Sequence, residues 1–146
     1  MINVVVADDF IESGTLAEER CSAVIFYLID LNEALLQVQA SIKAAQPVAD
    51  GAVCLELYKC GPFCIGCPHP RWVKYRWAKP IGARPARLLC VNLDAKRINP
   101  AQAIAKSGPA RKALLPLIRQ AKALIAERTA LSKVLRALSP FARPRR

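Results

Sequence analysis

Apolar residues recur at alternating spacings of three and four between residues 15 and 46, which is the period of one helix face. Thr15-x-x-Glu18 has the form of a capping box and predicts that the helix starts at Thr15. Pro47 predicts its end, because proline cannot continue a helix. The spacing is that of a coiled-coil seam, so residues 15–47 are expected to pack against another helix. The seam consists of Cys21, Val24, Leu28, Leu31, Leu35, Val38 and Ile42.

A second stretch with the same spacing occupies residues 109–138. Before it, Asn99-Pro100 predicts the start of a short helix, because asparagine caps helices and proline suits the first helical position. Gly108 is expected to end that short helix. Pro109 opens the longer one, in which Pro116 is a candidate site for a kink. Its seam consists of Leu114, Leu117, Ala121, Leu124, Arg128, Leu131, Leu135 and Leu138.

The two long helices carry opposite charge, the first acidic and the second basic. They are therefore expected to pair, either within one chain or between the copies of a homodimer through residues 15–46 and 109–138. The flanking segments complete the division of the chain: an N-terminal arm at 1–14 with a short strand at 2–7, a basic helical segment at 99–138, and a disordered basic tail at 139–146.

Three segments between the helices have the alternation that is typical of strands. Residues 52–58 place Val53, Leu55 and Leu57 on one face. Residues 71–79 mix aromatic and basic side chains, and residues 87–93 are largely apolar. Together they predict a three-stranded antiparallel sheet within residues 51–94. The expected fold class is α+β: a small sheet with a Cys/His metal knuckle, flanked by two long coiled-coil-like helices.

The loop between the first two strands holds three of the six cysteines and the only histidine. Cys60, Cys64, Cys67 and His69 have the spacing C-x3-C-x2-C-x-H. Zinc takes four tetrahedral ligands, mostly thiolates and imidazoles, so these side chains would complete its shell. A zinc site with no position open for water or substrate is structural. The sequence therefore predicts a structural zinc knuckle at these four residues.

The sequence also allows a different fourth ligand and a different metal cofactor. If His69 is an ordinary loop histidine, Cys54 or Cys90 on the flanking strands becomes the candidate fourth ligand, although a single strand cysteine is more often a small buried hydrophobe. C-x3-C-x2-C resembles the motif of radical S-adenosylmethionine enzymes, which hold a [4Fe–4S] cluster on three cysteines. That family needs a large partial barrel after the motif, and only 79 residues follow Cys67. A [4Fe–4S] cluster without the enzyme remains the alternative cofactor, because cysteine spacing does not fix the metal.

Several other classes of protein are disfavoured. Cys60 and Cys67 could form a disulfide in an exported protein, but the acidic N-terminus is unlike a signal peptide. A cytoplasmic location is therefore predicted, where clustered thiols stay reduced and favour metal binding. The longest apolar run, residues 23–29, is far short of a membrane span, so no membrane association is expected. With no catalytic triad, phosphate loop or paired carboxylates near the knuckle, the protein is expected not to be an enzyme.

The distribution of charge along the chain indicates the kind of partner that the protein binds. The first 50 residues contain eight acids and two bases, whereas the remaining 96 contain three acids and twenty bases, giving charges of −6 and +17. A block this basic attracts polyanions, and nucleic acid is the expected one, DNA more than RNA. The alternatives are a solvated basic surface or one masked by the acidic arm. The candidate nucleic-acid contacts are Arg71, Trp72, Lys74, Arg76, Lys79, Arg84 and Arg87.

The aromatic residues of the same strand divide between its two faces. Trp72 alternates with Lys74 and Arg76 on the basic face, where it could stack on an unpaired base or pack in the core. Tyr75 and Trp77 share the other face and are expected to pack in the core.

The stretch 55–77 resembles a family of small proteins of phages, plasmids and integrative conjugative elements. The likeness is carried by Lys59-Cys60-Gly61, by Cys64, Cys67 and His69-Pro70, and by the aromatic residues Trp72, Tyr75 and Trp77. Residues 87–138 match in layout only, and the x3 and x2 cysteine spacing and Arg71 depart from the family pattern. The resemblance implies a zinc-knuckle accessory protein that assists conjugative transfer, mobilisation or regulation. A helical protein–protein adaptor or dimerisation module with a structural zinc is the alternative.

Overall fold

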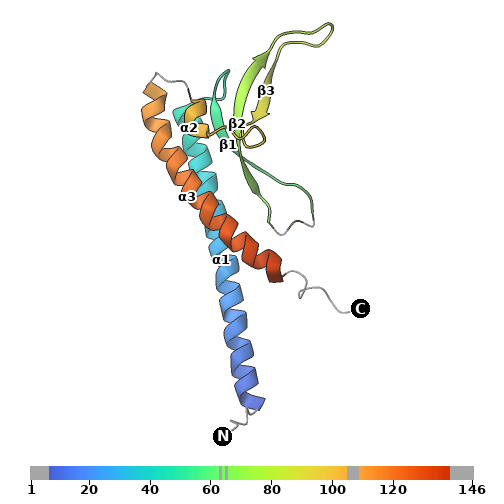
Figure 1. Ribbon diagram of the computed structural model, residues 1–146, viewed down its shortest axis with the longest axis vertical. Coiled ribbons are helices and arrows are strands. Elements are labelled where there is room, and N and C mark those ends of the chain that lie inside the picture. The colour runs from blue at the N-terminus through green and yellow to red at the C-terminus, as the bar shows by residue number, and fades with distance from the viewer. Residues whose placement is uncertain (1–6, 63, 65, 105–108, 139–146) are drawn as a thin grey trace.

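The computed structural model describes residues 7–62, 64, 66–104 and 109–138. The elements follow the order α1, β1, β2, β3, α2, α3 (Figure 1). The two long helices lie side by side and cross, and the sheet lies beside them at the end where α1 stops and α3 starts (Figure 1). The predicted α+β class, with a three-stranded antiparallel sheet and two long helices, is confirmed.

Helix α1 (Ala7–Ala45) begins well before the predicted start at Thr15. The predicted capping box is therefore wrong, as is the predicted arm over residues 7–14. Residues 1–6, which hold most of the predicted strand at 2–7, lie outside the described residues. The end at Ala45 agrees with the predicted stop at Pro47.

The apolar seam of α1 is buried in the C-terminal half of the helix only. Cys21 is exposed, and the N-terminal half extends beyond the rest of the molecule (Figure 1). Over Gly14–Ala45 the helix is long and apolar enough, by length and composition alone, to cross a membrane. Residues of its C-terminal half also contribute to the protein core. The buried seam positions are Leu28, Leu31, Leu35, Val38 and Ile42.

The sheet has the order β1-β2-β3, with every pair of neighbours antiparallel. Strands β1 (Val53–Tyr58), β2 (His69–Ala78) and β3 (Arg87–Asn92) match the three predicted strands to within two residues at each end. The central strand β2 pairs with β1 through residues 69–74 and with β3 through residues 73–78. Most of β2 therefore has a neighbouring strand on one side only.

The helices after the sheet begin as predicted. Asn99 caps α2 (Pro100–Ala103) by accepting a hydrogen bond from the backbone N–H of Ala101. The predicted stop at Gly108 and the predicted tail at 139–146 lie outside the described residues. Helix α3 (Pro109–Leu138) starts at the predicted proline and continues through Pro116.

The core forms where α1, α3 and the sheet meet. α1 and α3 pack against each other within one chain. A hydrogen bond of 2.6 Å from the Tyr27 hydroxyl to Glu127 joins them near the exposed part of α1. The apolar seams and the inner strand residues are thus used to build a single core. Its largest fully buried side chains come from all three parts: Leu35, Ile42, Leu55, Leu93, Leu114 and Ile118.

Candidate metal centre

The pairing of β1 with β2 closes the cysteine loop. Tyr58 and His69 are the last paired residues, with Cys60 two positions after the first and Cys67 two positions before the second. Continuing this register brings the two cysteines together, and the backbone N–H of Cys60 donates to Cys67 Sγ at 3.3 Å. The strand register therefore sets the entry and exit of the loop.

The four predicted ligands converge on one point. One ligand atom from each of Cys60, Cys64, Cys67 and His69 lies within 4.8 Å of all the others. Cys60 Sγ is 3.5 Å from Cys67 Sγ and 3.2 Å from His69 Nε2, and Cys64 Sγ is 3.1 Å from the same nitrogen. Bonds of about 2.3 Å to sulfur and about 2.0 Å to nitrogen separate the ligands of tetrahedral zinc by about 3.5–3.8 Å. The donor set suits such a shell, and the separations lie near this range, so the cluster could hold a metal ion.

The thiols influence one another strongly. Hydrogen bonds with Cys64 and with Cys67 raise the pKa of the Cys60 thiol to about 11. The hydrogen bond from the backbone N–H of Cys60 lowers the pKa of the Cys67 thiol. Cys67 is therefore the more readily ionised of the two, and a bound cation would favour the thiolate of each.

Arg128 of α3 holds the cysteine loop through hydrogen bonds to its backbone. The residue is only 4% exposed, and its Nη2 donates hydrogen bonds to the backbone carbonyl oxygens of Gly66 and Pro68. Its Nε donates to Asn32 Oδ1 of α1 at 2.6 Å. One side chain thus connects the cysteine loop to both long helices.

The charge of Arg128 also suits the site. Burial lowers the pKa of its guanidinium, and the neighbouring Cys67 and Cys64 oppose that effect. Arginine remains protonated at neutral pH even when partly buried. A zinc ion with three thiolates and a neutral imidazole would carry one net negative charge, which the guanidinium would offset. Sequence analysis placed Arg128 in the α3 seam without a role, and a charge at a seam position is the signal that could have singled it out.

The remaining cysteines stand apart from the cluster. Cys54 is buried in β1, and Cys90 is exposed on β3. Neither joins the group of ligand atoms found among the described residues, and His69 supplies the fourth donor instead. The alternative ligand sets raised by the sequence are therefore not those that the structure brings together.

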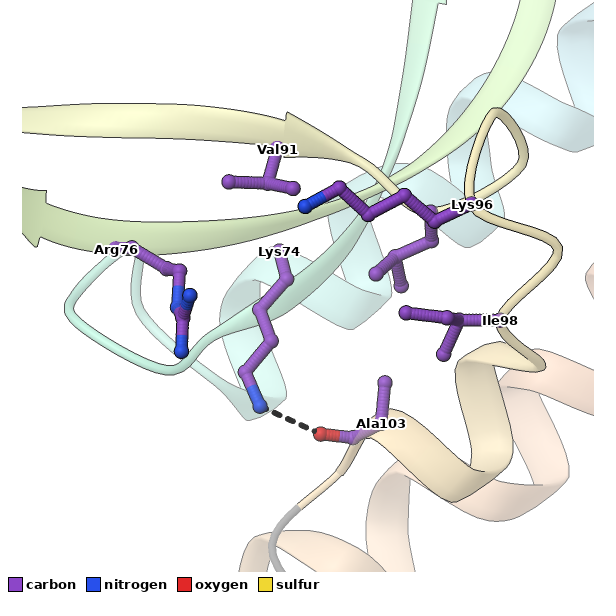
Figure 2. Close-up of a pocket in the computed structure, with 7 residues that line it drawn as sticks. Lys74, Arg76, Val91, Lys96, Ile98 and Ala103 are labelled. Atoms are coloured by element: carbon purple, nitrogen blue, oxygen red, sulfur yellow. Dashed lines mark hydrogen bonds between the residues drawn. The ribbon is translucent and has the colours of Figure 1, made fainter.

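The basic residues predicted to contact nucleic acid follow β2 and the turn after it. Lys74 is half-buried, and its Nζ donates to the carbonyl oxygen of Ala103 at 3.0 Å (Figure 2). The guanidinium of Arg71 lies 4.9 Å from the centre of the Tyr58 ring. Both therefore have structural contacts as well as charge. The other four are exposed: Arg76, Lys79, Arg84 and Arg87.

The structure decides between the two environments left open for Trp72 and contradicts the one expected for Trp77. Trp72 is 5% exposed and belongs to the core, so its predicted role in stacking on an unpaired base does not fit its position. Trp77, expected in the core, is 58% exposed. Burial decreases along β2 from Trp72 and Val73 to Arg76 and Trp77, regardless of the face. β1 does not pair with β2 beyond Lys74, and this explains why Trp72 is covered and Trp77 is exposed.

The acids that follow residue 50 are all engaged within the fold. Glu56 pairs with Lys43 of α1 at 2.9 Å, Asp94 accepts a backbone N–H, and Glu127 accepts a tyrosine hydroxyl. Among the side chains that the structure describes, Lys43–Glu56 is the one ion pair. The described bases after residue 50 therefore form no ion pair with any acid that the structure describes.

A cavity of about 210 Å³ lies beside β2 (Figure 2). Lys74, Arg76 and Lys96 surround it. Lys96 and its neighbour Arg97 follow β3 and were missing from the predicted contacts, although two adjacent bases directly after a strand are a readable signal. The cavity thus combines cationic and apolar walls, the latter from Val91, Leu93 and Ile98.

No family model, curated protein or solved structure matches this chain. The resemblance to accessory proteins of mobile elements therefore stays a prediction.

Proposed function

We propose that this protein is a non-enzymatic, zinc-stabilised protein that binds nucleic acid, with DNA as the polymer. The observation that carries the proposal is the unneutralised positive charge. Residues 51–146 carry a net charge of +17, and no described base among them forms an ion pair with a described acid. A polyanion provides the missing countercharge, and phosphate groups suit the exposed arginines.

Zinc is the metal that suits the four donors best. Three thiolates and one imidazole form a closed tetrahedral set, which is characteristic of structural zinc. A [4Fe–4S] cluster would place several iron and sulfide ions between its ligands. Donor atoms within 4.8 Å of one another leave room for a single ion instead. Zinc is accordingly the proposed cofactor, and [4Fe–4S] the alternative that metal analysis would detect.

The metal would serve nucleic-acid binding by fixing the basic strand. His69 is both a proposed ligand and the first residue of β2, so a metal bound there would anchor the strand that carries the cations. A two-stranded hairpin is marginal in water by itself, and metal binding contributes directly to folding. Arg128 then ties the anchored loop to the helices.

Contacts of this kind go to phosphates. They position a protein on the polymer with little preference for sequence, and they weaken steeply with salt. Each phosphate contact contributes a slope of about −0.9 in a plot of log binding constant against log salt concentration for B-DNA.

Fluorescence anisotropy with labelled single-stranded and duplex oligonucleotides at several salt concentrations tests the proposal. We expect binding at low salt that weakens as salt rises. Arg87→Ala should weaken it, whereas Arg20→Ala, which removes the same charge from exposed acidic α1, should not. No binding to any oligonucleotide at low salt by zinc-loaded protein would rule the proposal out.

The resemblance to accessory proteins of phages, plasmids and conjugative elements supports a role in conjugative transfer, mobilisation or regulation. This part of the proposal rests on residues 55–77 alone. Deleting the gene from a donor strain that carries such an element, followed by a mating assay, tests it. An unchanged transfer frequency would argue against a role in transfer.

A second candidate is a helical adaptor or homodimer that contains a structural zinc. The N-terminal half of α1 favours it, because this half exposes several large apolar side chains. Light scattering over a range of concentrations tests this candidate, with Phe26→Glu as the variant that should abolish association. The exposed apolar side chains of this half are Leu16, Ile25 and Phe26, of which Phe26 is 66% exposed.

A further inference from the structure

The hairpin formed by β2 and β3 projects from the body of the protein (Figure 1). At its base, the backbone N–H of Gly51 donates to the carbonyl oxygen of Tyr75, and the backbone N–H of Trp77 donates to Asp50 Oδ1. From Ala78 onward, the described backbone partners lie within the hairpin itself. We call residues 77–87 the ribbon.

The tip of the ribbon is a closed turn. Ile81 and Arg84 exchange two backbone hydrogen bonds, of 3.2 and 3.1 Å. Gly82 adopts φ +57°, which the two-residue turn requires and which glycine adopts without strain. This pair is flanked by Pro80 and Pro85. Proline has no backbone N–H, so neither residue can donate a hydrogen bond to a further strand at the edge. The tip is thus preorganised by its own chemistry.

The ribbon carries positive and apolar groups without any acid. Residues 57–93 contain no aspartate or glutamate. Arg76, at the base, and three bases in the ribbon are exposed: Lys79, Arg84 and Arg87. Two apolar side chains are exposed with them, Trp77 at the base and Ile81, 77% exposed, at the tip. This combination suits a partner that offers phosphates around a partly apolar hollow.

We infer that the ribbon enters the major groove of double-stranded DNA, an inference that rests on the proposed function. The major groove is about 12 Å wide and admits a two-stranded ribbon, whose strands lie about 4.8 Å apart. The minor groove, about 6 Å wide, is too narrow for both strands and their side chains. The five steps from Trp77 to Gly82 span roughly 16 Å when the backbone is extended, enough to reach the floor of a groove about 8.5 Å deep.

Single strands and duplex RNA fit the same surface less well. Proteins that hold single strands combine a basic groove with a series of aromatic platforms. Here Trp72 is buried, the Tyr75 hydroxyl is bonded to Glu56, and the ribbon projects from the body of the protein (Figure 1). The major groove of A-form RNA is too narrow for side chains to read. Duplex DNA is therefore the ligand that the ribbon favours.

The ribbon's residues have different expected roles. Arg76, Lys79 and Arg87 lie nearer the base, where the groove is bordered by phosphates. Arg84 lies at the tip, where it can reach a guanine edge, and Ile81 beside it can contact a thymine methyl group.

The test uses the full-length, zinc-loaded protein and a labelled B-DNA duplex in anisotropy titrations. Arg84→Ala should weaken binding about 5- to 100-fold, as expected for loss of a base contact. Arg119→Ala, which removes one exposed charge from α3, should change it less than about twofold. Circular dichroism and zinc content of each variant check that the fold is kept.

Groove preference is tested on the same duplex. Bulky substituents at the pyrimidine 5-position, which fill the major groove, should weaken binding at least tenfold, while the minor-groove ligand netropsin should have no effect. If the duplex binds but Arg84→Ala binds equally well, or if netropsin displaces the protein, the inference is wrong and the proposed function survives. If single strands bind more tightly than duplex, the inference also fails alone. If no nucleic acid binds, or only an acidic protein does, both fail.

Discussion

Replacing Arg128 by methionine removes the side chain that joins the cysteine loop to the two long helices. Methionine keeps a long apolar stem but leaves the carbonyl oxygens of Gly66 and Pro68 and the Asn32 side chain without their donor. Hydrogen bonds to a charged group contribute about 1.5–3 kcal/mol each. Three such bonds would total about 4.5–9 kcal/mol, a range that overlaps the cost of removing one partner of a buried ion pair, about 3–5 kcal/mol. Methionine also avoids the desolvation of a guanidinium, so we take the lower end of the ion-pair range. The expected loss in the free energy of unfolding is about 3 kcal/mol.

The same change should weaken zinc binding. Loss of an outer partner that orients metal ligands typically lowers affinity 10- to 100-fold. Arg128 contacts the loop through Gly66 and Pro68, which lie on either side of Cys67. Denaturant unfolding at saturating zinc measures the stability, and competition with a chelator measures the affinity. For a chain of this size, 3 kcal/mol corresponds to a fall in Tm of roughly 6–12 °C.

Two further variants control this prediction. Arg119→Met changes an exposed arginine of the same helix and should alter stability by no more than about 0.5 kcal/mol. Asn32→Ala removes only one partner of Arg128 and should cost about 1 kcal/mol, with a smaller effect on zinc. Should Arg128→Met match the parent in both unfolding free energy and zinc affinity, the reasoning about this contact would be refuted.

Three other outcomes are expected. Cys64→Ser should release the metal and unfold the β1–β2 hairpin, visible as loss of zinc and of amide-exchange protection in β2; retained protection would contradict this. Arg76→Ala should leave the thermal midpoint unchanged and weaken DNA binding, with a salt slope shallower by about 0.9; an unchanged slope would contradict it. Burial and the hydrogen bond to Glu56 raise the pKa of the Tyr75 hydroxyl above its usual value near 10. Because the folded state holds this proton more tightly, the stabilisation is present below about pH 10 and lost as pH rises beyond it. Tyr75→Phe should flatten that alkaline decline in denaturant unfolding, and an equally steep decline would show that another group causes it.

The local chemistry of the knuckle could be predicted from the sequence. Three cysteines and a histidine within ten residues, placed between two alternating segments, indicated both the donor set and its position at a hairpin end. The strands were predictable for the same reason, because alternation over six to ten residues reflects the pleat of the backbone directly. The C-terminal half of the α1 seam, from Leu28 to Ile42, was equally readable from its period.

Features that depend on tertiary contacts were not predictable. Alternation assigns Trp72 and Trp77 to opposite faces. Only the tertiary pairing, in which β1 begins at Val53 opposite Lys74, shows which part of β2 is covered. Arg128 lies 60 or more residues from its partners in the loop, so no local pattern connects them. The start of α1 was missed because a capping-box pattern also occurs within helices, where residues such as Thr15 need not cap anything.

Metal analysis of protein purified without added metal is the most direct measurement. Elemental analysis with an ultraviolet–visible spectrum should give one zinc per chain, no iron and no iron–sulfur absorption, and Cys64→Ser should contain none. Iron with sulfide in the purified protein would contradict the zinc assignment. A metal-free protein whose hairpin is as stable as that of the zinc-loaded form would contradict the view that Cys60, Cys64, Cys67 and His69 hold the basic strand in place.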